Sequence, residues 1–140
     1  MSDSALLCPS AQPHVPGAAV HGVVDSATGR IAYLEARVPV TPELLASTSP
    51  MLPTQVLRVS APCQEESCAH FANSTCTLGE RLVSILPASE QTIVRCAIRV
   101  SCRWFHEQGK AACLRCDLIV TDEYTRNTAL DSVATPPLAR

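Results

Sequence analysis

Short runs of apolar residues that alternate with polar ones predict strands in the first sixty residues of the chain. Val20–Val24 is a β-prone run, and Arg30–Val40 is a longer run rich in Ile, Leu, Tyr and Val. The five residues between them, Asp25–Gly29, have the composition of a turn, so the two runs are expected to form a hairpin with a loop closed by glycine. Gln55–Ser60 also alternates, and it predicts a third strand.

Two segments carry the signals of helices. Thr41 is suited to the N-cap and Pro42 to the first helical position, so we expect a short helix that ends near Ser47. Thr77–Leu86 places its leucines and a valine on one face of a helix, and Pro87 is expected to stop it.

The last third of the chain gives a mixed pattern. Thr92–Cys102 alternates as a strand would, but its arginines recur every four residues as in a helix, so both alternatives stay open. Trp104–Ile119 is expected to be helical in part, with Gly109 as a weak point. The sequence is polar from about Asp122, so residues 123–140 are expected to form a flexible tail.

These segments predict an α+β fold. A small antiparallel sheet from the N-terminal half would pack on a metal-organised, mostly helical C-terminal half. The length of 140 residues suits one domain with its own core. We expect residues 1–122 to form a single metal-binding domain, with a β-rich part at 14–60 and a cysteine-rich part at 61–122.

The N-terminal residues and the overall hydropathy predict a cytoplasmic protein. The N-terminal segment from Met1 contains Ser, Asp, Pro and Gln where a secretory signal has a basic start and an apolar run. No stretch approaches the roughly 20 apolar residues of a membrane span, so no membrane partner is expected. The net charge of −2 gives no general attraction to nucleic acid.

Cysteine is the residue type that departs most from an average composition. The chain has eight, and seven of them fall between Cys63 and Cys116. They follow the order Cys8, then Cys63-x4-Cys68-x7-Cys76, then Cys96-x5-Cys102-x10-Cys113-x2-Cys116. Because cytosolic thiols are kept reduced, a set this dense predicts metal ligands rather than disulfides. His70 lies inside the first group and is a further candidate ligand.

The spacing indicates a metal site but leaves the metal and the grouping open. The eight thiols divide into two sets of four; seven thiols and His70 would do the same and leave Cys8 free. Zinc modules usually have two short ligand pairs close together, whereas the short pairs here, which end at Cys68 and Cys116, are far apart. We therefore expect one or two iron–sulfur clusters, preferably 4Fe–4S, with zinc as the alternative.

Three arginines and an adjacent aromatic residue lie among the C-terminal cysteines. Arg95, Arg99, Arg103 and Trp104 are the residues expected to border the cofactor. Cations favour thiolates and would compensate the negative charge of a metal held by four of them. A nucleic-acid role for this stripe is not expected, because two aromatics beside a few arginines make a weak motif.

These observations predict an electron carrier or an accessory subunit of a partner oxidoreductase or larger complex. The alternative is a structural zinc module that mediates an interaction or regulation. A catalytic Cys–His pair is the third class, but eight cysteines are too many for that explanation. His14 and His21 are far from the cysteine-rich segment in sequence, and neither is expected to take part.

The cysteine-containing segments resemble small, cysteine-rich bacterial proteins. The residues that carry the resemblance are Cys8-Pro9-Ser10, Ala61-Pro62-Cys63 through His70-Phe71 to Cys76, Cys102-Arg103-Trp104-Phe105, Gly109, Ala112-Cys113 and Arg115-Cys116. The resemblance covers most of the chain up to about Asp122. It implies that Cys8 belongs to the same cysteine set, and it carries over no activity.

Overall fold

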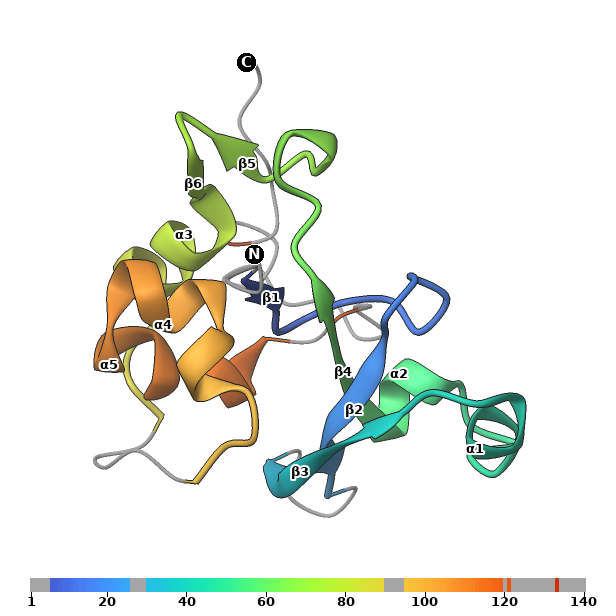
Figure 1. Ribbon diagram of the computed structural model, residues 1–140. Helices are drawn as coiled ribbons and strands as arrows, with labels where there is room; N and C mark the ends of the chain where they lie inside the picture. The colour runs from blue at the N-terminus through green and yellow to red at the C-terminus, as the bar shows by residue number, and fades with distance from the viewer. Residues whose placement is uncertain (1–5, 26–29, 90–94, 120, 122–132, 134–140) are drawn as a thin grey trace.

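The computed structural model describes residues 6–25, 30–89, 95–119, 121 and 133. Four strands form the main sheet in the order β1-β4-β2-β3 (Figure 1). They are β1 (Leu7–Cys8), β2 (Ala19–Val24), β3 (Ile31–Pro39) and β4 (Leu57–Pro62). Every pair in this sheet is antiparallel, as the sequence predicts.

The predicted hairpin of β2 and β3 is confirmed. Val20 pairs with Val38 and Val23 with Ala32, and the register shifts between Val20 and Gly22. A Cβ atom at Gly22 would lie 2.7 Å from Cγ2 of Ile31, so the strands approach too closely there for any side chain. The loop between the strands lies outside the described residues.

The third predicted strand exists, but its start is wrong. Pro53 opens a one-turn helix, α2 (Pro53–Val56), and the backbone becomes extended only from Leu57. Proline is favoured at the first position of a helix, and this signal outweighed the alternation at Gln55 and Val56. All of Leu57–Ala61 is buried, on both faces of the sheet.

The C-terminal half is mostly helical, as predicted, and a small hairpin leads into it. The hairpin is β5 (Phe71–Ala72) and β6 (Thr75–Cys76), and the helices are α3 (Thr77–Ile85), α4 (Arg103–Gln108) and α5 (Lys110–Cys113). Three 3₁₀ turns are η2 (Glu65–Ser67), η3 (Arg99–Ser101) and η4 (Cys116–Leu118). The break predicted at Gly109 separates α4 from α5, with φ at +69°.

Other sequence-based expectations have mixed outcomes. In α1 (Pro42–Ala46) the Thr41 side chain accepts a hydrogen bond from the Leu44 amide at 3.1 Å, which confirms the predicted cap. The described part of Thr92–Cys102 is a turn followed by η3, so neither the strand nor the helix prediction holds there. Most of 123–140 lies outside the described residues; Val133 is fully buried.

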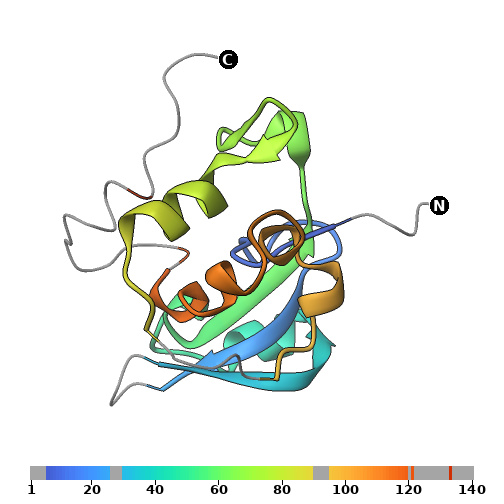
Figure 2. The same cartoon turned by 90° about the vertical axis from the view of Figure 1, so that its left-hand side faces the viewer.

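The helical half packs against the sheet and each half has its own apolar cluster, which confirms the α+β class (Figure 2). The sheet cluster centres on Val20, Leu57 and Val59. The helical cluster includes Leu82, Trp104 and several cysteines. None of the helices that the structure describes is long and apolar enough to cross a membrane.

Candidate metal centres

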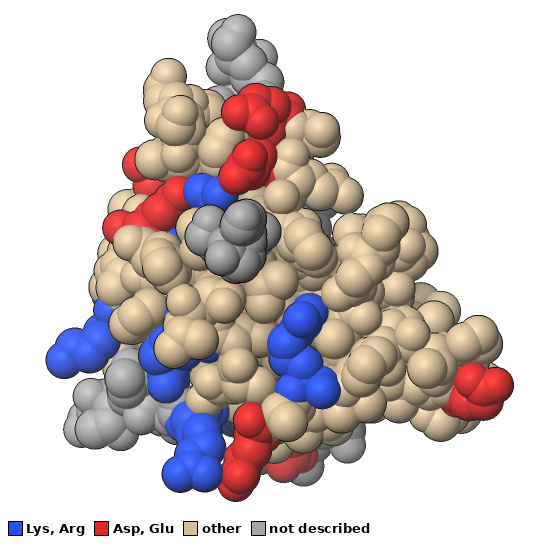
Figure 3. Space-filling view, in the orientation of Figure 1, with Lys and Arg blue, Asp and Glu red and all other residues tan. Residues whose placement is uncertain are grey.

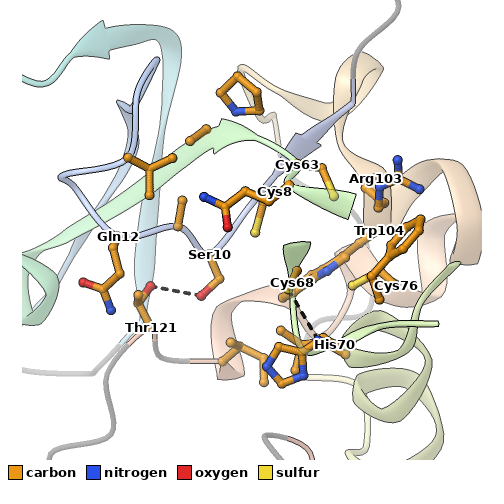
Figure 4. A pocket seen from close by; sticks show the side chains of 18 of the residues that line it. Cys8, Ser10, Gln12, Cys63, Cys68, His70, Cys76, Arg103, Trp104 and Thr121 are labelled. Carbon is orange, nitrogen blue, oxygen red and sulfur yellow. Dashed lines mark hydrogen bonds between the residues drawn. The ribbon is translucent and has the colours of Figure 1, made fainter. Parts of the chain in front are cut away.

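The structure sorts the eight cysteines into two groups of four, each lining its own cavity. Site 1 consists of Cys8, Cys63, Cys68 and Cys76. Site 2 consists of Cys96, Cys102, Cys113 and Cys116. The cavity at site 1 has a volume of about 340 Å³, and that at site 2 about 30 Å³. Figure 4 shows the four cysteines of site 1 grouped beside Trp104 and Arg103.

Strand pairing at the edge of the sheet assembles site 1. β1 pairs with β4 so that Cys8 lies opposite Ala61, and the Cys63 amide donates to the Leu6 carbonyl at 2.8 Å. The chain then turns through η2 and returns as β5–β6, which brings Cys68 and Cys76 to the same cavity. The sequence missed β1 because a two-residue strand is too short to show a periodicity.

Helix ends assemble site 2. Cys102 is the residue before α4, Cys113 is the last residue of α5, and Cys116 begins η4. The positive φ of Gly109 lets α5 turn back beside α4, which returns Cys113 towards Cys102. Cys96 reaches the same cavity from the turn that precedes η3.

Backbone amides point at five of the eight sulfurs. The amide of His70 lies 3.4 Å from the sulfur of Cys68. The sulfurs of Cys8, Cys76, Cys96 and Cys102 also accept amide hydrogen bonds, each from a residue two or three positions further along the chain: Ser10; Leu78 and Gly79; Ile98; and Trp104 and Phe105. Such donors stabilise sulfur in its anionic form, and they tune the potentials of iron–sulfur clusters.

Side chains supply donors to two further sulfurs. The guanidinium of Arg103 reaches the sulfur of Cys63 in site 1. In site 2, Nη2 of Arg58 lies 3.4 Å from the sulfur of Cys116. The hydroxyl of Tyr33 also faces Cys116, and burial together with that sulfur raises the pKa of Tyr33 far above its usual value.

Burial keeps several of these thiols protonated in the metal-free protein. It raises the pKa of Cys8 to about 11 and that of Cys102 to about 12. The pKa values of Cys76 and Cys96 are raised for the same reason, and their amide donors act in the opposite direction. A metal that binds here must therefore displace protons from the sulfurs.

Arg58 is a buried cation that the sequence-based site prediction missed. It is 2% exposed and donates to the carbonyls of Pro9 at 2.7 Å and Cys116 at 2.9 Å. Burial alone would lower its pKa, but Cys116, Tyr33, Cys8 and Cys102 raise it. Among the described residues no carboxylate pairs with Arg58, and the groups that raise its pKa are these cysteines and Tyr33. The sequence feature that could have identified Arg58 is its position between Leu57 and Val59 in a predicted strand.

The predicted arginines separate in the structure. Arg103 is 7% exposed, lines site 1 and pairs with Glu65 at 2.9 Å and Glu107 at 2.7 Å. Arg99 lines site 2. Arg95 lines neither cavity; it lies on the surface, 3.3 Å from Glu35.

Three histidines line the two cavities. His70 lines site 1, with its Nδ1 2.7 Å from Nη2 of Arg81. His14 also lines site 1 and His21 lines site 2, although both are far from the cysteine-rich segment in sequence. β2 is an inner strand of the sheet and carries His21 to site 2, a long-range effect that sequence distance does not show.

The geometry of each quartet differs from that of a single-ion site. A zinc ion draws its four sulfurs to within roughly 4 Å of one another. In the described part of the chain, which includes all eight cysteines, no three His, Cys, Asp or Glu side chains come together closely enough to hold one metal ion. The sulfurs of each quartet therefore border a space instead of meeting at a point.

Comparison with known proteins gives no match: no family model, no curated protein and no solved structure is similar to the chain. The interpretation of the two quartets therefore depends on their own chemistry.

Proposed function

We propose that the protein is an iron–sulfur protein that binds a 4Fe–4S cluster in each quartet and carries electrons. The observation that carries this proposal is the division of the eight cysteines into two quartets, each around its own cavity. A 4Fe–4S cluster needs one thiolate at each of four separated corners, whereas a single zinc ion needs four sulfurs in contact with one centre. The four cysteines around each cavity match the number of thiolates that such a cluster needs.

The surroundings of both quartets suit an anionic cluster. A 4Fe–4S cluster held by four thiolates carries net negative charge, and Arg58, Arg103 and Arg99 place cations against the sulfurs. The cluster, when bound, supplies one-electron redox chemistry. The chain binds it through the cysteines and sets its potential through the amide, arginine and tyrosine donors.

The role that follows is an electron carrier or an accessory subunit of an oxidoreductase, without a catalytic residue of its own. A dense set of cysteines that serve as metal ligands suits a reducing compartment, and we therefore propose a cytoplasmic location.

Anaerobic purification followed by metal analysis and an absorption spectrum tests the proposal. We expect iron and acid-labile sulfide in equal amounts and a brown protein whose visible absorption bleaches on reduction. A colourless protein that holds zinc would contradict the proposal and favour a structural zinc module.

A further inference from the structure

One tryptophan forms part of the wall of both sites. Trp104 is the single tryptophan of the chain, is 1% exposed and lines both cavities. It is the second residue of α4 and lies two residues after Cys102 of site 2. Its ring lies beside Cys76 of site 1 (Figure 4).

Trp104 directs one hydrogen-bond donor to each site. Its backbone amide donates to the sulfur of Cys102 in site 2. Its indole Nε1 is buried and has no conventional partner among the described residues. That N–H lies towards Cys76 of site 1 without meeting the geometry of a hydrogen bond to its sulfur, and it opposes the burial that raises the pKa of this thiol. A single residue thus forms part of the wall of both quartets.

Arg58 joins the same two sites by charge. Its guanidinium lies over the Trp104 ring, with Cζ 5.9 Å from the ring centroid. It donates to the sulfur of Cys116 in site 2, and its positive charge also acts on Cys8 in site 1. A cation that is buried and not paired with a described carboxylate responds to negative charge in either site.

The packing holds the ring of Trp104 in place. A Cβ atom at Gly79, in the first turn of α3, would lie only 3.1 Å from Cδ1 of Trp104. The backbone of α3 therefore packs closely against the indole, and the guanidinium of Arg58 lies over the ring. Together they fix the orientation of the ring, with its N–H towards Cys76.

We propose that Trp104 and Arg58 form a bridge through which the two sites exchange an electron. This inference rests on the proposed function. A reduced cluster in one site loses one electron and becomes oxidised, and the oxidised cluster in the other site gains it, with no other reactant. Trp104 provides the contact between the sites, and Arg58 compensates the additional negative charge on whichever site holds the electron.

The contact is tested by replacing the tryptophan in the loaded, full-length protein. Half-reduced protein is prepared by pulse reduction with one electron per chain, and the approach to equilibrium between the sites is followed by rapid-freeze paramagnetic resonance. Trp104→Leu should slow this approach at least tenfold, and Trp104→Phe, which keeps a ring but lacks the N–H, should have an intermediate effect. Leu82→Ala is the control for lost packing, because Leu82 is fully buried in α3 but lines neither cavity.

The shared charge is tested by redox titration of both sites. Arg58→Gln should lower both reduction potentials, each by about 59 mV, which is a tenfold change in a one-electron equilibrium. Arg103→Gln removes a cation that reaches the sulfur of Cys63 in site 1, and it should lower only the potential of that site. Arg58→Lys should restore most of the loss.

The outcomes separate this inference from the function on which it rests. Zinc in both sites, or iron in one site only, overturns the bridge; the first result also rejects the iron–sulfur proposal. The bridge is also overturned if the two reduced clusters show no magnetic interaction and Trp104→Leu leaves the transfer rate unchanged. That result leaves the iron–sulfur function intact.

Discussion

At the scale of single residues, two polar side chains are buried in the sheet beside the cysteines. Arg58 on β4 and His21 on β2 lie on neighbouring strands and both are nearly inaccessible. Both imidazole nitrogens of His21 lack a hydrogen-bond partner among the described residues, and the ring stacks on Tyr33 at 6.2 Å. Unpaired buried polar groups destabilise a fold, so their presence beside the quartet of site 2 points to a role there.

His21 predicts a loss of stability in acid. Burial first, and then the charges of Arg58 and Arg37, lower the pKa of His21 to about 3. The unfolded chain takes up this proton below about pH 6.5 and the folded protein does not, so stability falls as pH decreases through that window by at most about 1.4 kcal/mol per unit.

Denaturant unfolding of the wild type and of His21→Leu at pH 7 and pH 5 measures this contribution. Between the two pH values the wild type should lose about 2 kcal/mol more than the variant, if the full shift is expressed. Equal losses in the two proteins would show that His21 does not remain neutral when the protein is folded.

At the scale of elements, the sequence predicts what depends on local periodicity or capping. The hairpin of β2 and β3, the cap at Thr41 and the helix after Thr77 all follow from neighbouring residues. Neighbouring residues do not predict the two-residue strand β1, because its pairing with β4 decides it. They do not predict the turn after Arg95 either, because the position of site 2 decides that turn.

The candidate sites, too, could be predicted only in part from the sequence. The cysteines themselves are evident from the sequence, since their density needs no structure to be noticed. Their division into quartets is not, because Cys8 reaches site 1 only through β1. Arg58 and His21 join the sites from strands whose register the sequence does not specify.

The two halves of the molecule should respond differently to metal removal. The apolar cluster of the helical half contains Cys102 and packs against Cys76, Cys96 and Cys116, whereas the sheet cluster contains no cysteine among the described residues. Because the free energy of metal binding becomes folding free energy, the metal-free protein should lose order around α3, α4 and α5 and keep β2 and β3 paired.

Hydrogen exchange measured by mass spectrometry before and after chelation tests this difference. The amides of Thr77–Ile85 and Arg103–Gln108 should lose protection, and those of β2 should keep it. Unchanged protection in the helices would show that the metal does not organise this half.

At the scale of the whole molecule, charge is distributed unevenly. Figure 3 shows acidic side chains towards the β5–β6 end and most of the basic ones towards the opposite end near α4 and α5, where acidic side chains also lie beside them. Glu65 and Glu66 are exposed on η2, and Arg95 and Lys110 are exposed at the end near site 2. Val100, 82% exposed, provides an apolar spot there. We propose that this end receives an acidic redox partner.

Lys110→Glu tests the direction of this attraction with small reagents of known charge. At low ionic strength the variant should be oxidised severalfold more slowly by hexacyanoferrate(III), an anion, and the difference should disappear in high salt. Glu66→Lys at the other end is the matched control and should change the rate less. A rate that is insensitive to Lys110→Glu would place the site of electron exchange elsewhere.

The iron content of variants in each quartet tests the central claim most directly. After anaerobic reconstitution the wild type should hold about eight iron atoms per chain, and Cys76→Ser of site 1 and Cys102→Ser of site 2 should each hold about four. The circular dichroism of each variant shows whether it has folded. Binding of zinc in place of iron, or an iron content that neither substitution reduces, would contradict two iron–sulfur sites built from these quartets.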